Sequence, residues 1–222
     1  MKSSLFNILG PVMIGPSSSH TAGAARLGRA AYMMLGKPPR KVRFTLHGSF
    51  AETYRGHGTD RALVAGLLGM QPYDEGLRDS LQLAKDQGIQ VEFVPGDLGD
   101  VHPNTVLIEM TDDQGQEHTL MGSSIGGGNV RILQVDSAKA DFSGEYPVIL
   151  TTHRDQVGAL SHITQVLAEQ GVNIVTLRLT REKRGDLAFA IIETDTLADP
   201  AALQAIRSLD EVLAVTSLEK LL

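Results

Sequence analysis

Hydrophobic and polar residues alternate along the chain with two different periods, and these predict a succession of short helices and strands. Small and apolar residues recur at helical spacing over 24–35, and a two-residue alternation follows over 41–47. Further helices are predicted over 61–69 and 74–87, and further strands over 89–94, 105–110, 117–121 and 130–135. The first two thirds of the chain therefore predict a domain that mixes helices and strands.

The last third of the chain has a simpler order of elements. Strands are predicted over 147–152, 172–180, 187–193 and 212–218, and helices over 157–170 and 201–208. This βαββαβ order predicts a small ferredoxin-like sandwich with two helices on one face of a sheet. A polar, aperiodic stretch over 137–146 is predicted to be a linker. We therefore expect an α+β chain with one domain over 1–140 and a second over 147–222.

Composition and charge exclude several classes of function. The chain has 222 residues, of which 42% are hydrophobic and 21% charged, as in ordinary globular proteins. A net charge of -6 without a basic cluster argues against nucleic-acid binding. The apolar run near the N-terminus is broken by Gly10 and Pro11, which argues against a signal peptide or a membrane span and favours the cytoplasm.

The chain contains no cysteine. This excludes a disulfide, a thiolate nucleophile and a cysteine-ligated cluster on the chain itself. We expect no metal site on this chain, and any such chemistry must come from a partner.

A run of polar residues near the N-terminus is the first candidate for chemistry. A loop is predicted here between helix-breaking residues and the helix that starts at position 24, and it contains Ser17, Ser18, Ser19, His20 and Thr21. Hydroxyls at the positive end of a helix can cap its free N–H groups, and the same geometry can hold a carboxylate or a phosphate. Both interpretations remain open from these residues alone.

A second candidate precedes the next predicted helix. His57 stands between Gly56 and Gly58 in a predicted loop, with Thr59 or Asp60 as the expected helix cap. The two glycines would let a ligand or a partner chain approach the imidazole closely. A solvated loop histidine is the alternative.

Two later loops are also candidates. In His102-Pro103-Asn104 the proline restrains the preceding residue, so that two polar side chains project from a stiff turn; a simple turn is the alternative. The glycine-rich stretch over 122–129 lacks the lysine of a phosphate-binding loop and precedes a strand. Close backbone packing or a small anionic ligand is the better expectation for it.

The C-terminal part resembles an ACT domain, a regulatory module that usually binds small amino acids. The resemblance lies in the segments 155–160 and 171–174. It implies that Gly158 lets an effector approach a helix N-terminus, with Asp155, Leu160 and Asn173 as further effector-binding residues. It also implies self-association through this domain. A purely structural ACT domain that dimerises without a ligand is the alternative.

The four polar and glycine-rich motifs occur in order ahead of that domain, and together they resemble the β chain of bacterial iron–sulfur L-serine dehydratases over essentially the whole length. In this family the first domain is similar to the allosteric-substrate-binding domain of some phosphoglycerate dehydrogenases. The resemblance implies that L-serine loses its hydroxyl and α-proton to give aminoacrylate, which hydrolyses to pyruvate and ammonia. It also implies a [4Fe–4S] cluster on a partner α chain, one iron of which acts as a Lewis acid on the leaving hydroxyl.

The same resemblance implies roles for individual residues. Ser17 and Ser18 would hold the substrate carboxylate, and Thr59 and Asn104 would orient the substrate or an imidazole. His57 is the preferred general base and His20 the second choice. The cysteine-bearing region of the single-chain members is missing, so we expect the chain to be inactive without an α subunit.

Two other functions remain open from the sequence. The chain could be a stand-alone amino-acid sensor without turnover, or a structural dimerisation protein. Within the dehydratase hypothesis, the serine-rich run could serve an allosteric serine site in place of the active site.

Overall fold

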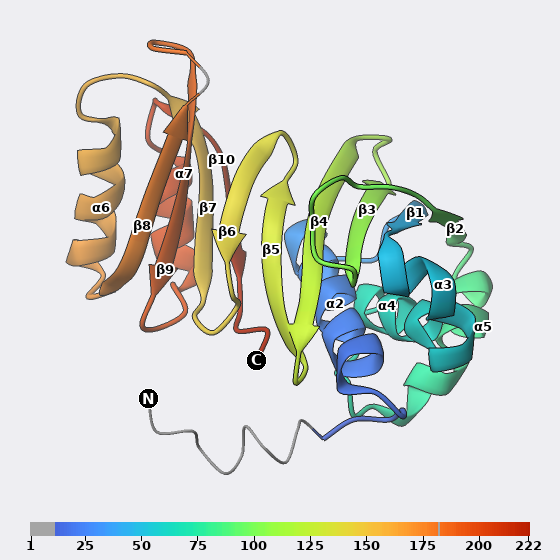
Figure 1. The fold of residues 1–222 in the computed structure, drawn as a ribbon. Coiled ribbons are helices and arrows are strands. Elements are labelled where there is room, and N and C mark those ends of the chain that lie inside the picture. Colours follow the sequence, from blue (N-terminus) through green and yellow to red (C-terminus); the bar gives the residue numbers. More distant parts are fainter. Residues whose placement is uncertain (1–11, 182) are drawn as a thin grey trace. The chain divides into compact units, whose positions relative to one another are not determined.

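The computed structural model describes residues 12–181 and 183–222 (Figure 1). The chain divides into two compact units, of which the first runs to Ser143 and includes Leu221–Leu222, and the second is Gly144–Lys220. Within the described ranges, every helix is too short or too polar to cross a membrane.

The first unit contains a six-stranded sheet in the order β2-β1-β3-β4-β5-β6. Its strands are β1 (Lys41–Leu46), β2 (Gln90–Pro95), β3 (Thr105–Thr111), β4 (Glu117–Gly126), β5 (Asn129–Val135) and β6 (Ala138–Phe142). β1 and β2 are parallel, and the other pairs are antiparallel. On β1, Val42, Phe44 and Leu46 are fully buried while Lys41 and Arg43 are exposed, so one face of the sheet forms the core.

Helices lie beside strands β1 to β4 in this unit (Figure 1). They are the short π-helix η1 (Ser18–Gly23), α2 (Ala24–Leu35), α3 (Gly48–His57), α4 (Thr59–Leu67), the 3₁₀ turn η2 (Glu75–Asp79) and α5 (Ser80–Asp86). The helix predicted over 24–35 is confirmed. The single helix predicted over 74–87 is wrong, because the chain changes from a 3₁₀ turn to an α-helix at Ser80.

Helices α2 and α4 pack against each other at two glycines. A Cβ atom at Gly28 would meet the carbonyl oxygen of Leu63, and one at Gly66 would meet the carbonyl oxygen of Ala25. The two helices therefore approach backbone to backbone, which leaves no room for a side chain at either position. Because η1 continues directly into α2, this contact also fixes where η1 lies relative to the start of α4.

Two predicted loops are strands in the structure. The stretch over 137–146 is not simply a linker, because β6 occupies part of it and pairs with β5, and Ala140 and Phe142 are buried. The glycine-rich stretch over 122–129 continues β4 and turns at Gly127 and Gly128 into β5. A Cβ atom at Gly122 would meet the side chain of Leu27, so close packing accounts for that glycine.

The second unit has the predicted βαββαβ order. Its elements are β7 (Val148–Arg154), α6 (Ala159–Glu169), β8 (Ile174–Arg181), β9 (Leu187–Thr194), α7 (Pro200–Arg207) and β10 (Val212–Leu218). The four strands form an antiparallel sheet in the order β10-β7-β9-β8. Ile149 and Ile192 from the strands and Ile163 and Ile206 from the helices form its core. The predicted α+β class is thus confirmed.

Candidate functional site

The serine-rich segment is helical, and the loop predicted there is wrong. Ser18–Gly23 forms one π-helical turn that runs into α2. Ser17 caps this turn, since its Oγ accepts a hydrogen bond from the backbone N–H of His20 at 3.2 Å. Ser18 is half-buried beside it. π-helical turns are rare in proteins, and those that occur are often found at functional sites.

His57 is the last residue of α3 and does not lie in a loop. Gly58 ends α3 with φ of 72°, a left-handed conformation that favours glycine, and its N–H donates to the carbonyl of Tyr54. α4 begins at the next residue without a side-chain cap, so the predicted capping role of Thr59 or Asp60 is wrong. His57 is therefore held, exposed, where one helix ends and the next begins.

The structure brings His20 and His57 together. Their ring centroids are 4.7 Å apart with an interplanar angle of 81°. The ring of His20 also packs edge-on against Phe50 at 5.4 Å. His20 is 9% exposed, so the histidine pair has one buried and one exposed member.

Two hydroxyls hold the buried ring of this pair. Nδ1 of His20 lies 3.3 Å from Oγ of Ser17, and Nε2 lies 3.2 Å from Oγ of Ser49. Burial, and then the nearby His57, lower the pKa of His20 below its usual value, while Ser49 opposes this shift. This shift favours the neutral form of the His20 imidazole. Ser49 stands outside the motifs that the sequence singled out, and only the fold places it here.

We expect the stability of this unit to depend on pH through His20. In the unfolded chain His20 takes up a proton at about pH 6.5, the ordinary pKa of histidine. In the folded chain its pKa is lower, so it takes up the proton only at lower pH. The unfolded state then binds more protons, so the free energy of unfolding falls as the pH drops below about 6.5. Urea unfolding at about pH 7.5 and 5.5 should show a smaller fall for His20→Gln than for the unchanged chain.

His118→Gln is the matched control for that comparison, because His118 belongs to the same unit but lines a different groove. An equal pH dependence in His20→Gln and in the unchanged chain would contradict the expectation.

The other two motifs pack against the same elements. The N–H of Phe50 donates to the carbonyl of Pro103 at 3.4 Å, so the turn before β3 lies against the start of α3. The N–H of Ser124 donates to the carbonyl of Asn104 at 2.9 Å, and its Oγ donates to the carbonyl of Ser19 at 2.9 Å. All four motifs therefore converge around η1.

Three buried polar atoms in these motifs have no hydrogen-bond partner among the described residues. They are Oγ1 of Thr21, Oγ1 of Thr59 and Oδ1 of Asn104. An unpaired buried polar atom costs about 1–3 kcal/mol, so such atoms are places where a ligand could bind favourably. Thr59 and Asn104 were predicted from the sequence as substrate-binding residues, and Thr21 was not.

A cavity of about 230 Å³ opens beside His57, and we call it the His57 cavity. It is lined by Ile14, Gly15, Pro16, Thr21, Arg55, Gly56, His57, Gly58, Arg61, Leu77 and Arg78. Of the predicted site residues, only His57 lines it. Arg61 directly follows the second motif and begins the helix predicted over 61–69. Arg78 belongs to η2, and no sequence pattern indicated that it would line a cavity.

The residues predicted to bind an effector in the second unit make contacts within that unit. Oδ2 of Asp155 accepts from the N–H of Gly185 and from Nη1 of Arg181, both at 2.9 Å, and these two donors lower the pKa of Asp155. Nδ2 of Asn173 donates to Asp195 at 2.6 Å.

The remaining two predicted effector residues lie on and beside α6. Gly158 precedes the helix with φ of 94°, and Leu160 packs against the core. Effector binding at these four positions stays a prediction.

Comparison with known proteins gives two family matches. The model of the serine dehydratase beta chain matches residues 4–86, and the model of the ACT domain matches residues 148–211. The two matches fall in the first and the second unit respectively.

Full-length relatives agree with these matches. The chain is 42% identical over 215 residues to a probable L-serine dehydratase, beta chain, of Bacillus subtilis, covering 97% of each chain. It is 41% identical over 193 residues to the L-serine dehydratase, beta chain, of Peptoniphilus asaccharolyticus, covering 86% of this chain and 87% of the relative. A D-3-phosphoglycerate dehydrogenase of Archaeoglobus fulgidus is 26% identical over 199 residues, which are 88% of this chain and 37% of that protein. The identities of 42% and 41% to the two beta chains, over most of their length, show that the chain belongs to the family of L-serine dehydratase beta chains.

Proposed function

We propose that this chain is the β subunit of a two-chain L-serine dehydratase, which converts L-serine to pyruvate and ammonia together with an α chain. The observation that carries the proposal is the contact between His20 and His57, since it joins two separate motifs into one pair of imidazoles. A beta chain implies a partner chain, and the two relatives of highest identity named above are both beta chains.

The chain does not fit the role of holding an iron–sulfur cluster. It has no cysteine, and the described residues contain no group of three or more histidine, aspartate or glutamate side chains placed to bind a metal ion. We therefore propose that the [4Fe–4S] cluster belongs to the α chain, where it would act as a Lewis acid. The contribution of this chain is then restricted to imidazoles, hydroxyls and backbone amides.

Within that division, His57 is the proposed general base for the α-proton of serine. Its ring is exposed at the surface of the unit, where a substrate held by a second chain can reach it. His20 is the proposed positioning residue. It is buried and held between Ser17 and Ser49, and its ring contacts that of His57.

The serine-rich turn is the proposed holder of the substrate carboxylate. Oγ of Ser17 is already engaged in capping, which leaves Ser18 as the freer hydroxyl at the start of η1. Thr59 and Asn104 each have a buried oxygen without a hydrogen-bond partner among residues 12–181 and 183–222, and these oxygens suit an orienting role. These assignments are consistent with the positive end of a helix favouring an anion.

Co-expression with a candidate α chain under anaerobic conditions tests the proposal. We expect a complex that contains iron and forms pyruvate from L-serine, and no pyruvate when either chain is omitted. Pyruvate formation by this chain alone, without iron, would overturn the proposal. Failure of any cysteine-rich chain to co-purify would favour the alternative of a stand-alone amino-acid sensor.

A further inference from the structure

The His57 cavity is lined by positive charge. Arg55, Arg61 and Arg78 line it together with His57, and no aspartate or glutamate is among its lining residues. This contrasts with the chain as a whole, whose net charge is -6. A cavity with one sign of charge concentrates ligands of the opposite sign.

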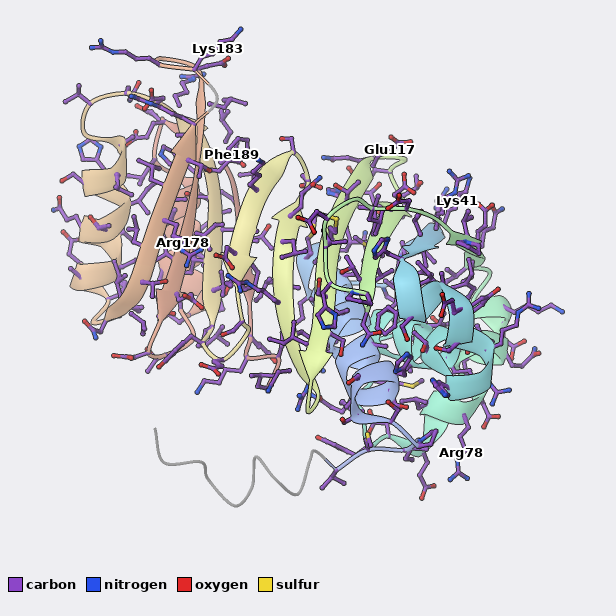
Figure 2. All side chains as sticks on the ribbon, viewed as in Figure 1. Lys41, Arg78, Glu117, Arg178, Lys183 and Phe189 are labelled. Carbon is purple, nitrogen blue, oxygen red and sulfur yellow. The ribbon has the colours of Figure 1, made fainter. Side chains whose placement is uncertain are left out.

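The three guanidinium groups differ in how far they are engaged elsewhere. Arg55 lies over the ring of Tyr54 at 5.4 Å, and both Arg55 and Arg61 are near the carboxylate of Asp60. Asp60 lines a neighbouring groove together with Arg55 and Tyr54, and it does not line the His57 cavity. For Arg78 the described part of the chain offers neither a hydrogen bond nor an ion pair, and it lies at the surface of the first unit (Figure 2). Its charge is therefore available to a ligand.

Two further features of the cavity favour an anion. Gly58 lines the cavity and precedes α4, a nine-residue helix, so the positive end of that helix faces the same space. Thr21 also lines it, is 1% exposed, and has an Oγ1 without a hydrogen-bond partner among the described residues. A buried hydroxyl can donate to an oxyanion, which would satisfy the unpaired group.

We propose that the His57 cavity binds a small oxyanion that carries phosphate or carboxylate groups and no ammonium group. Guanidinium groups bind both kinds of oxyanion through paired N–H donors. The ammonium group of an amino acid such as L-serine would meet three guanidinium groups and no carboxylate among the lining residues, so a zwitterion is disfavoured. An anion in this cavity contacts His57 and therefore regulates access to that imidazole. This regulatory role rests on the function proposed above, whereas the binding itself does not.

Titration calorimetry of the full chain with inorganic phosphate, in a chloride buffer, tests the proposal. We expect phosphate to bind, and Arg78→Ala to weaken the binding about tenfold or more, as the loss of a charge-assisted hydrogen bond does. Arg61→Gln should weaken phosphate binding as well, and this variant replaces Arg78→Ala in the test if Arg78→Ala fails to fold. Arg40→Ala is the matched control, because it removes one positive charge from the same unit at a residue that does not line the cavity. It should leave the affinity unchanged.

Two comparisons complete the experiment. In spectra of the histidine ring protons, phosphate should shift the signal of His57 most, and L-serine should not displace phosphate. Absence of phosphate binding, equal affinity in the unchanged chain and both cavity variants, or displacement by L-serine would each overturn the proposal. None of these results bears on pyruvate formation by the complex, so the two proposals fail separately.

Discussion

Replacing His57 by alanine should lower the turnover of L-serine by the reconstituted two-chain complex about 10²-fold or more, which is the usual effect of losing a general base. The reason is geometric, since His57 is the exposed member of the histidine pair and a substrate held by the α chain can reach its ring. The measurement is kcat from the rate of pyruvate release at saturating L-serine. The thermal unfolding temperature should change little, because the side chain of His57 is exposed.

His118→Ala is the control for this prediction, because it removes an imidazole from the same unit at a different groove. It should keep turnover close to that of the unchanged complex, because His118 lies beside Asp112 and Asp136 and does not contact the histidine pair. If His57→Ala retained near-normal turnover, His57 would have no place in the mechanism and His20 would remain as the candidate base.

Replacing Gly66 by alanine should lower the free energy of unfolding of the first unit by about 1–3 kcal/mol. The added methyl group would meet the carbonyl oxygen of Ala25 and the backbone nitrogen of Arg29, which belong to the facing helix. Backbone atoms cannot turn aside as a flexible side chain can, so α2 and α4 would have to separate. Urea unfolding measures the loss.

Gly56→Ala is the matched control for that substitution. Gly56 is also in a helix, but a Cβ atom there would meet no atom of the described residues within 4 Å. Alanine should therefore stabilise the chain by about 0.5–1 kcal/mol, because it restricts the unfolded state. Changes of the same sign and size for the two substitutions would show that the contact between α2 and α4 does not exclude a side chain at Gly66.

Periodicity predicted those parts of the fold in which one face of an element is buried. The helix over 24–35 agrees with α2, and the strand over 212–218 agrees with β10. The predicted order of the second unit is confirmed for the same reason, since each of its elements has one apolar side against a shared core. The stretch over 137–146 was predicted to be aperiodic, because the alternation in β6 covers only the five residues Ala138–Phe142 and is flanked by polar residues.

The site was predicted only in part, because its geometry depends on contacts between distant segments. Both histidines were identified from polar residues beside glycines, but the sequence placed each of them in a loop. The left-handed Gly58 allows α3 and α4 to follow one another without a loop, and no local pattern indicates this. Ser49 and Arg78 take part only because α3 and η2 fold against the segment around His20 and Thr21.

The π-helical turn at Ser18–Gly23 has a consequence for how such chains can diverge. A π-turn contains one more residue than an α-turn between hydrogen-bonded partners. Deleting one residue between His20 and Ala24 would let α2 extend as an ordinary helix and would rotate His20 about 100° around its axis, away from His57. The contact between the two imidazoles therefore depends on the number of residues in this turn. Descendants that keep the pair of imidazoles should vary here by exchange of residues and never by insertion or loss.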